Sequence, residues 1–131
     1  MGTKHLKILG LGDASLLADA AVIRQFVETL IAKLGMRPLG EPTIHDVPLD
    51  LKKLGVEPFE DEGGVTTQIV GYHTLSTSHV AIHTWPLRNE FHLDIYSCKY
   101  FDAETIKRFI ADYFKCTKIK ASDLTAATEW A

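Results

Sequence analysis

Residues 75–98 read LSTSHVAIHTWPLRNEFHLDIYSC and decide the organisation of this 131-residue chain. Strand-forming Val, Ile, Thr and Trp are frequent in residues 78–85, and a second such run occupies residues 91–98. The segment between them, residues 86–90, has the length of a hairpin connection. The stretch therefore predicts two antiparallel strands joined by a short turn.

The register of this hairpin determines which side chains meet. If Trp85 lies opposite Phe91, then Ser78 lies opposite Cys98. Residues directly opposite each other in an antiparallel pair share a face, with Cβ atoms about 5 Å apart. A hydroxyl and a thiol that are distant in sequence are therefore expected to meet at the open end of the hairpin.

His83 is not expected to reach the same place. It follows Ser78 by five residues, so the alternation of side chains along a strand points it to the opposite face. It also lies about 16 Å along the strand, at about 3.3 Å per residue. One chain can hardly bring His83 to its own Ser78, whereas a second copy of the chain could.

Composition indicates a single globular domain spanning residues 1–131. Hydrophobic residues make up 46%, charged residues 24% and the net charge is −3 without a basic run, which argues against a nucleic-acid partner. No apolar segment has the length needed to cross a membrane and the first residues do not resemble a signal peptide, so we expect a cytoplasmic protein. Cys98 and Cys116 are expected to be free thiols.

The remaining sequence supplies further strands and two helices. Strands are predicted over residues 5–11, 36–47, 65–75 and 117–120, and a loop over 48–64. Apolar residues at helical spacing predict a helix through Leu34, which Asp13 or Ser15 can cap and Gly35 can end. Asp102 is expected to cap a second amphipathic helix.

The order of these elements predicts an α+β fold with two helices on one face of an antiparallel sheet. Both faces of the hairpin are mostly apolar or neutral. The uncovered face of the sheet therefore needs a partner, and we expect the sheet of a second copy, which gives an αββα dimer.

The hairpin sequence resembles that of one protein family. STSHVAIHTWP, residues 76–86, followed by Cys98, is similar to the pattern of the bacterial and archaeal S-adenosylmethionine decarboxylases. That pattern has Ser-His, three residues, His-Thr-Trp-Pro and then a cysteine at the same distance. The match is dense over residues 76–98 and weaker elsewhere. The resemblance implies a pyruvoyl-dependent decarboxylase of polyamine and spermidine biosynthesis, made as a proenzyme that cleaves itself.

The resemblance also implies a role for each matching residue. The bond between Thr77 and Ser78 would be cleaved, and Ser78 would become the pyruvoyl group that forms a Schiff base with the substrate. His83 would be the processing base and Cys98 the catalytic proton donor. The family also implies a homodimer with shared active sites.

The chemistry of such an enzyme explains why these residue types are needed. Decarboxylation of an amine-bearing acid requires an electron sink, which a carbonyl condensed with the substrate amine supplies. Ser78 Oγ would attack the Thr77 carbonyl, and elimination, tautomerisation and loss of ammonia would leave the pyruvoyl group. A histidine can transfer protons in these steps, and a thiol can protonate the substrate carbon after CO2 leaves.

Three positions depart from the family pattern. Thr77 replaces a glutamate before the cleaved bond, Leu87 replaces a glutamate that binds the ribose, and Val70 replaces a serine that assists the processing histidine. The aromatic residues that enclose adenine in the family have no clear counterpart either. The sequence thus supports the pyruvoyl machinery better than a nucleoside pocket.

Three functions remain open from the sequence. S-adenosylmethionine is the default substrate by resemblance, whereas some relatives act on arginine or ornithine. A cationic substrate of that kind could pair with the acidic side chains of Glu60, Asp61 and Glu62, although a solvated acidic surface loop is the favoured explanation for them. The third possibility is an unprocessed, non-enzymatic homologue that binds a partner or ligand, which the loss of a hydroxyl at Val70 favours.

The histidines do not predict a metal site. His79 and His83 share a face of the predicted strand but lie about 13 Å apart, which is too far for one ion. We therefore expect no metal.

Overall fold

A computed structural model describes residues 4–50 and 65–125. Six strands form one sheet of order β2-β3-β4-β5-β1-β6, in which all neighbours are antiparallel. The strands are β1 (Lys4–Leu11), β2 (Thr43–Asp50), β3 (Val65–Thr74), β4 (His79–Trp85), β5 (Glu90–Ser97) and β6 (Lys118–Asp123). The helices are α1 (Ala14–Leu17), α2 (Ala20–Leu34) and α3 (Ala103–Tyr113), with a 3₁₀ turn, η1 (Pro86–Arg88).

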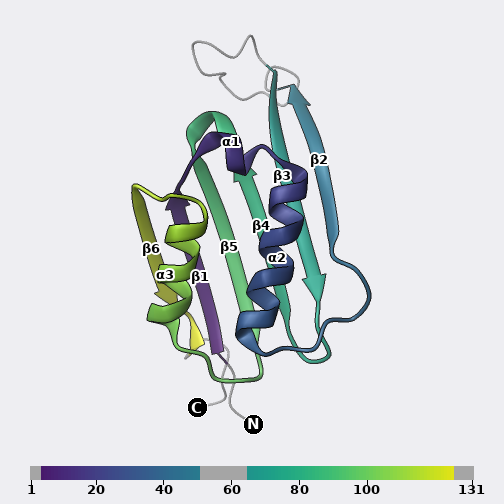
Figure 1. The fold of residues 1–131 in the computed structure, drawn as a ribbon, viewed down its shortest axis with the longest axis vertical. Coiled ribbons are helices and arrows are strands. Elements are labelled where there is room, and N and C mark those ends of the chain that lie inside the picture. Colours follow the sequence, from purple (N-terminus) through teal and green to yellow (C-terminus); the bar gives the residue numbers. More distant parts are fainter. Residues whose placement is uncertain (1–3, 51–64, 126–131) are drawn as a thin grey trace.

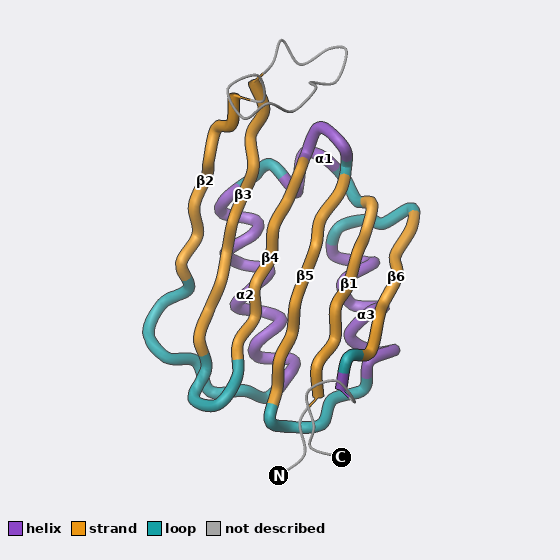
Figure 2. The backbone as a smooth tube through the Cα atoms, turned by 180° about the vertical axis from the view of Figure 1, so that it is seen from behind, coloured by secondary structure: helices purple, strands orange, loops and turns teal. Residues whose placement is uncertain are grey.

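The two longer helices, α2 and α3, cover the same face of the sheet (Figure 1). Seen from behind, the strands lie in front of the helices, and no helix of the described residues covers this open face (Figure 2). The α+β fold with two helices on one face of an antiparallel sheet is confirmed.

The helical pattern after β1 forms two helices rather than the single one predicted. Asp13 caps α1 by accepting a bond from Ser15 N at 2.8 Å. Asp19 then caps α2 by accepting a bond from Ala21 N at 2.9 Å. Because the Asp19 carboxylate satisfies free N–H groups of a helix start, it favours a new helix at this point. Gly35 ends α2 in the left-handed conformation, with φ 66°, as expected from the sequence.

Strand β2 begins later than predicted. The strand expected from residue 36 starts at Thr43, after two prolines and after Gly40, which has a φ of 68°. It then continues through Pro48, where a loop was expected. β2 is an edge strand, and an edge position tolerates a residue without an N–H donor.

Aromatic side chains join the helices to the sheet. Phe26 of α2 is fully buried, and its ring centroid lies 4.6 Å from that of Phe114 and 6.0 Å from that of Phe109. Phe91, the first buried residue of β5, lies 5.0 Å from Phe114. This packing fixes the β4–β5 hairpin against the helical layer, so the alternate side chains of the hairpin are presented on the open face.

Candidate active site

The β4–β5 hairpin has a different register from the one predicted. Trp85 lies opposite Glu90 rather than Phe91, a shift of one residue. The connection is four residues long, because η1 is followed by Asn89 in the left-handed conformation with φ 56°. Strand β5 therefore starts at Glu90, one residue before the start at Phe91 that the sequence predicted.

This shift changes which hydroxyl meets the thiol. Continuing the register past the end of the strands places Thr77, not Ser78, opposite Cys98. Thr77 Oγ1 lies 2.5 Å from Cys98 Sγ. Ser78 Oγ instead accepts a hydrogen bond from the backbone N–H of Cys98, at 3.0 Å. The prediction that Ser78 and Cys98 oppose each other is wrong, yet both residues and Thr77 form one cluster at the open end of the hairpin.

The Thr77–Ser78 bond lies at the end of the tight turn between β3 and β4. Leu75 N donates to Ser78 O at 2.9 Å, and Ser76 N donates to Arg37 O at 3.1 Å. The main chain on both sides of the bond is therefore held in place, while the Thr77 and Ser78 side chains both contact Cys98.

The two cysteines differ in the environment of their thiols. The pKa of Cys98 is lowered from its ordinary value, chiefly by the hydrogen bond with the Thr77 hydroxyl and also by Ser78 and the charge of Lys99. Burial raises the pKa of Cys116 to about 11. Both are free thiols in the structure, as predicted, and Cys98 is the one in a polar setting.

His83 lies on the open face of β4 with its imidazole exposed. Its Nδ1 is 3.3 Å from Nε2 of Gln68 on β3, and its ring stacks on Trp85 with centroids 6.1 Å apart. Val70 and His92 flank it directly on the neighbouring strands. The sequence interpretation missed Gln68. Its position two residues before Val70 on the same strand face was the available signal.

Within one chain, His83 is separate from the cluster of Thr77, Ser78 and Cys98. It lies about 16 Å along β4 from Ser78 at the usual rise per residue. The expectation that Cys98 faces away from His83 is wrong, because the corrected register puts Cys98 on the same open face by alternation. Distance alone now separates the predicted base from the predicted proton donor.

A second polar group on the open face was not predicted. The carboxylate of Asp94 on β5 is hydrogen-bonded to two imidazoles. His5 Nε2 lies 2.8 Å from its Oδ1, and His79 Nε2 lies 3.3 Å from its Oδ2. The His79 ring also stacks on Tyr96, with centroids 5.5 Å apart. These contacts hold the residue that follows Ser78. The alternation of side chains along each strand was the available sequence signal for these residues. Only the pairing of β1 with β5, however, brings His5 to Asp94.

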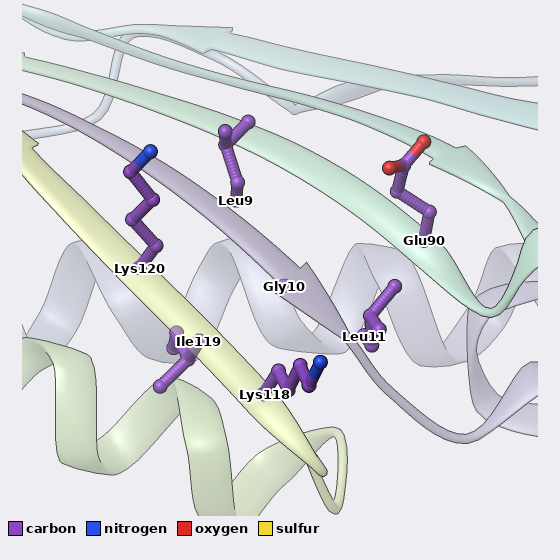
Figure 3. Close-up of a pocket in the computed structure, with 7 residues that line it drawn as sticks. All are labelled: Leu9, Gly10, Leu11, Glu90, Lys118, Ile119 and Lys120. Carbon is purple, nitrogen blue, oxygen red and sulfur yellow. The ribbon is translucent and has the colours of Figure 1, made fainter.

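A shallow hollow of about 470 Å³ lies on the open face between β1, β5 and β6 (Figure 3). It is lined by Leu9, Gly10, Leu11, Glu90, Lys118, Ile119 and Lys120. Glu90 stands at the opposite end of β5 from Cys98, so within one chain this hollow does not contain the cluster.

Comparison with known proteins identifies the family. The sequence matches the S-adenosylmethionine decarboxylase family model over residues 8–126. The chain belongs to this family. The fold is similar to the crystal structure of the adenosylmethionine decarboxylase from Aquifex aeolicus VF5, with a TM-score of 0.61 and 20% identity over 95% of this chain and 92% of that chain. The sequence matches none of the curated proteins with which it was compared.

The resemblance inferred from residues 76–98 is thus confirmed, and this member of the S-adenosylmethionine decarboxylase family keeps the hairpin motif while departing around it. Val70 stands opposite His83, Leu87 is exposed in η1, and Thr77 contacts Cys98. The departures therefore all lie on or beside the hairpin.

Two further observations concern ligands and membranes. Within residues 4–50 and 65–125, no group of three or more His, Cys, Asp or Glu side chains is arranged to hold a metal ion. No helix in those ranges is long and apolar enough to span a bilayer. The acidic residues considered for substrate binding, Glu60, Asp61 and Glu62, lie outside the described residues.

Proposed function

We propose that this protein is a pyruvoyl-dependent decarboxylase that serves polyamine biosynthesis, with S-adenosylmethionine as the default substrate. The observation that carries the proposal is the cluster at the end of the hairpin. The residues flanking the Thr77–Ser78 bond both contact Cys98, at 2.5 and 3.0 Å. These contacts support the assignment of the Thr77–Ser78 bond as the cleavage site and of Cys98 as the proton donor.

Conversion of Ser78 into the group that the proposal requires needs no additional space. Conversion of a serine into a pyruvoyl group adds no heavy atom, because a ketone oxygen replaces the main-chain nitrogen and a methyl replaces the hydroxymethyl. Once formed, the group supplies a ketone that condenses with the substrate amine and withdraws electrons from the bond to CO2. The position of Ser78 at a turn, with its side chain turned to Cys98, suits this use.

The chain's own residues carry the proton transfers. The Ser78 hydroxyl must lose a proton to attack the Thr77 carbonyl, and the imidazole of His83 is suited to accept it. The N–H of Cys98 orients the Ser78 oxygen at 3.0 Å. The thiol of Cys98 then donates its proton to the substrate carbon that CO2 has left, and solvent restores the thiol.

His83 is proposed to come from a second copy of the chain. Because it lies about 16 Å from Ser78 along β4, it cannot serve its own cluster. A two-fold axis between two facing sheets and perpendicular to their strands exchanges the two ends of β4. Each His83 then lies across from the end of the other chain's β4 that carries Thr77 and Ser78, which gives a homodimer with two shared sites.

The character of the open face supports this arrangement. Its side chains include the aromatic rings of Trp85 and Tyr96 and the imidazole of His92, all only partly buried in one chain. A face of this composition is suited to a protein partner. We propose that the partner is the open face of an identical chain, in the αββα arrangement.

Leu87 favours a second candidate substrate class. Its side chain is 53% exposed in η1 and cannot accept hydrogen bonds from a ribose. Arginine or ornithine has no ribose and carries a cationic side chain, with which Glu60, Asp61 or Glu62 would pair.

Val70 favours a third candidate, an unprocessed homologue that binds a partner or ligand. It lies directly opposite His83, where a serine could have donated a proton. A chain that never cleaves would keep the fold and the open face but lack the electron sink.

Mass spectrometry of the purified protein tests these candidates. Self-cleavage predicts two fragments, 1–77 and 78–131, the second lacking the ammonia that a serine N-terminus would retain. Ser78→Ala should give one intact chain without decarboxylase activity. A single intact mass for the wild-type chain would favour the non-enzymatic homologue, and normal cleavage of Ser78→Ala would refute the assignment of Ser78.

A further inference from the structure

Cys98 contacts the side chains on both sides of the bond that is proposed to break. Thr77 Oγ1 lies 2.5 Å from Cys98 Sγ, and Ser78 Oγ accepts a bond from the Cys98 N–H at 3.0 Å. These two residues flank the Thr77–Ser78 bond. Any covalent change at that bond therefore changes the surroundings of the thiol.

The proposed self-cleavage, on which this inference rests, consumes one water. Ser78 Oγ bonds to the Thr77 carbonyl carbon as the C–N bond between the two residues breaks, which gives an ester. Loss of the Ser78 Cα proton and of its Cβ–O bond then frees Thr77 as a carboxylate. Water supplies the ketone oxygen at residue 78, and the former main-chain nitrogen leaves as ammonia.

Cleavage reverses the electrostatic effect of residue 77 on the Cys98 thiolate, from stabilising to destabilising. Before cleavage, the Thr77 hydroxyl stabilises the thiolate, because hydrogen bonds to a charged form favour that form. After cleavage, the Ser78 hydroxyl no longer exists, and a negative charge stands on the residue whose side chain contacts the sulfur. A nearby charge of the same sign disfavours the thiolate.

We infer that Thr77 is a positioning residue that acts on Cys98 twice: its hydroxyl favours the thiolate in the uncleaved chain, and its new C-terminal carboxylate keeps the thiol protonated afterwards. Self-cleavage thereby converts Cys98 into the proton donor that decarboxylation needs. The lowered pKa of Cys98 in the uncleaved chain, with Thr77 as its largest cause, agrees with the first state.

The other titratable groups around Cys98 remain the same in both states. Lys99 follows it in the chain, and its Nζ is bonded to Gly35 O at 3.1 Å. Lys4 on β1 pairs with Ser97, and the following row of the sheet, that of Tyr96, carries His79 on β4 and His5 on β1. Cleavage neither creates nor removes any of these charges, so the Thr77 carboxylate is the new charge.

The test measures the pH at which Cys98 becomes reactive. Cys116→Ser removes the other cysteine of the chain, and the rate of alkylation by iodoacetamide is followed against pH in native protein without substrate. The cleaved chain should show a midpoint about one pH unit or more above that of the uncleaved Ser78→Ala chain. An equal or lower midpoint in the cleaved chain would overturn the inference.

Substitution of Thr77 separates its two roles. In the uncleaved Ser78→Ala chain, Thr77→Val should raise the midpoint and Thr77→Ser should restore it, because only serine returns a hydroxyl. In the cleaved chain, Thr77→Val should leave the midpoint nearly unchanged, because the carboxylate is retained. Equal shifts in both states would indicate a merely structural role and overturn the inference. Absence of cleavage on a denaturing gel would overturn the proposed function as well.

Discussion

Val70 lies directly opposite His83 in the β3–β4 pair, while Gln68, on the same face of β3, holds Nδ1 of that histidine at 3.3 Å. The imidazole is therefore oriented by an amide, but the side chain directly opposite it on β3 offers neither a donor nor an acceptor. If His83 is the processing base, this pairing limits the rate of self-cleavage.

Val70→Ser should accelerate self-cleavage. A hydroxyl opposite His83 adds a group that can relay a proton, and such groups contribute about a hundredfold or more where they take part. Even partial use should give about a tenfold increase, measured as the appearance of the 78–131 fragment on a denaturing gel. Val70→Ala is the matched control and should cleave at the original rate. Equal rates for Val70→Ser and Val70→Ala would show that position 70 does not act in processing.

Leu87→Glu should improve the use of S-adenosylmethionine. The carboxylate can accept hydrogen bonds from a ribose, so kcat/KM for this substrate should rise about tenfold while the values for arginine and ornithine change little. CO2 release from the three substrates is measured in parallel, first for the wild-type chain. Leu87→Gln introduces a side chain of nearly the same size as glutamate but without its charge. It should give a smaller increase in kcat/KM for S-adenosylmethionine. A uniform change for all three substrates would mean that Leu87 does not contribute to specificity.

Co-expression of Ser78→Ala with His83→Ala should restore activity. Each variant is expected to be inactive alone, but a mixed dimer with shared sites has one site with both lesions and one with none. Its turnover should be about half that of the wild type per dimer, because one site of two is intact.

The matched control for this experiment is Ser78→Ala with Cys98→Ala. Ser78 and Cys98 are in contact within one chain, so every mixed site keeps one lesion and turnover should stay low. Mixed dimers of the first pair that form but remain inactive would place His83 and Ser78 of one site in the same chain.

Phe26→Ala should destabilise the fold by about 3–5 kcal/mol, because it removes a fully buried ring and leaves a cavity. The free energy of unfolding is measured with urea at one protein concentration in the Ser78→Ala chain, so that self-cleavage does not divide the unfolding chain into two fragments. Leu39→Ala changes a side chain that is 53% exposed and should shift the free energy by only about 0.5 kcal/mol or less. Similar losses in both variants would contradict the position of Phe26 at the centre of the core.

The sequence by itself determined the family, the α+β class and the existence of the hairpin. These follow from local signals: apolar residues at helical spacing, a glycine that ends α2, and the motif in residues 76–98. The motif also selected Thr77, Ser78 and Cys98 as site residues, and the structure brings all three together.

Only the tertiary structure decided which atoms meet. The hairpin register depends on the left-handed conformation of Asn89 in the turn, and a shift of one residue exchanges the two strand faces without changing the composition of either strand. The contact of Cys98 Sγ with Thr77 rather than Ser78 follows from that shift. The bond between His5 and Asp94 needs the pairing of β1 with β5, and residues 89 positions apart carry no local signal of such a contact.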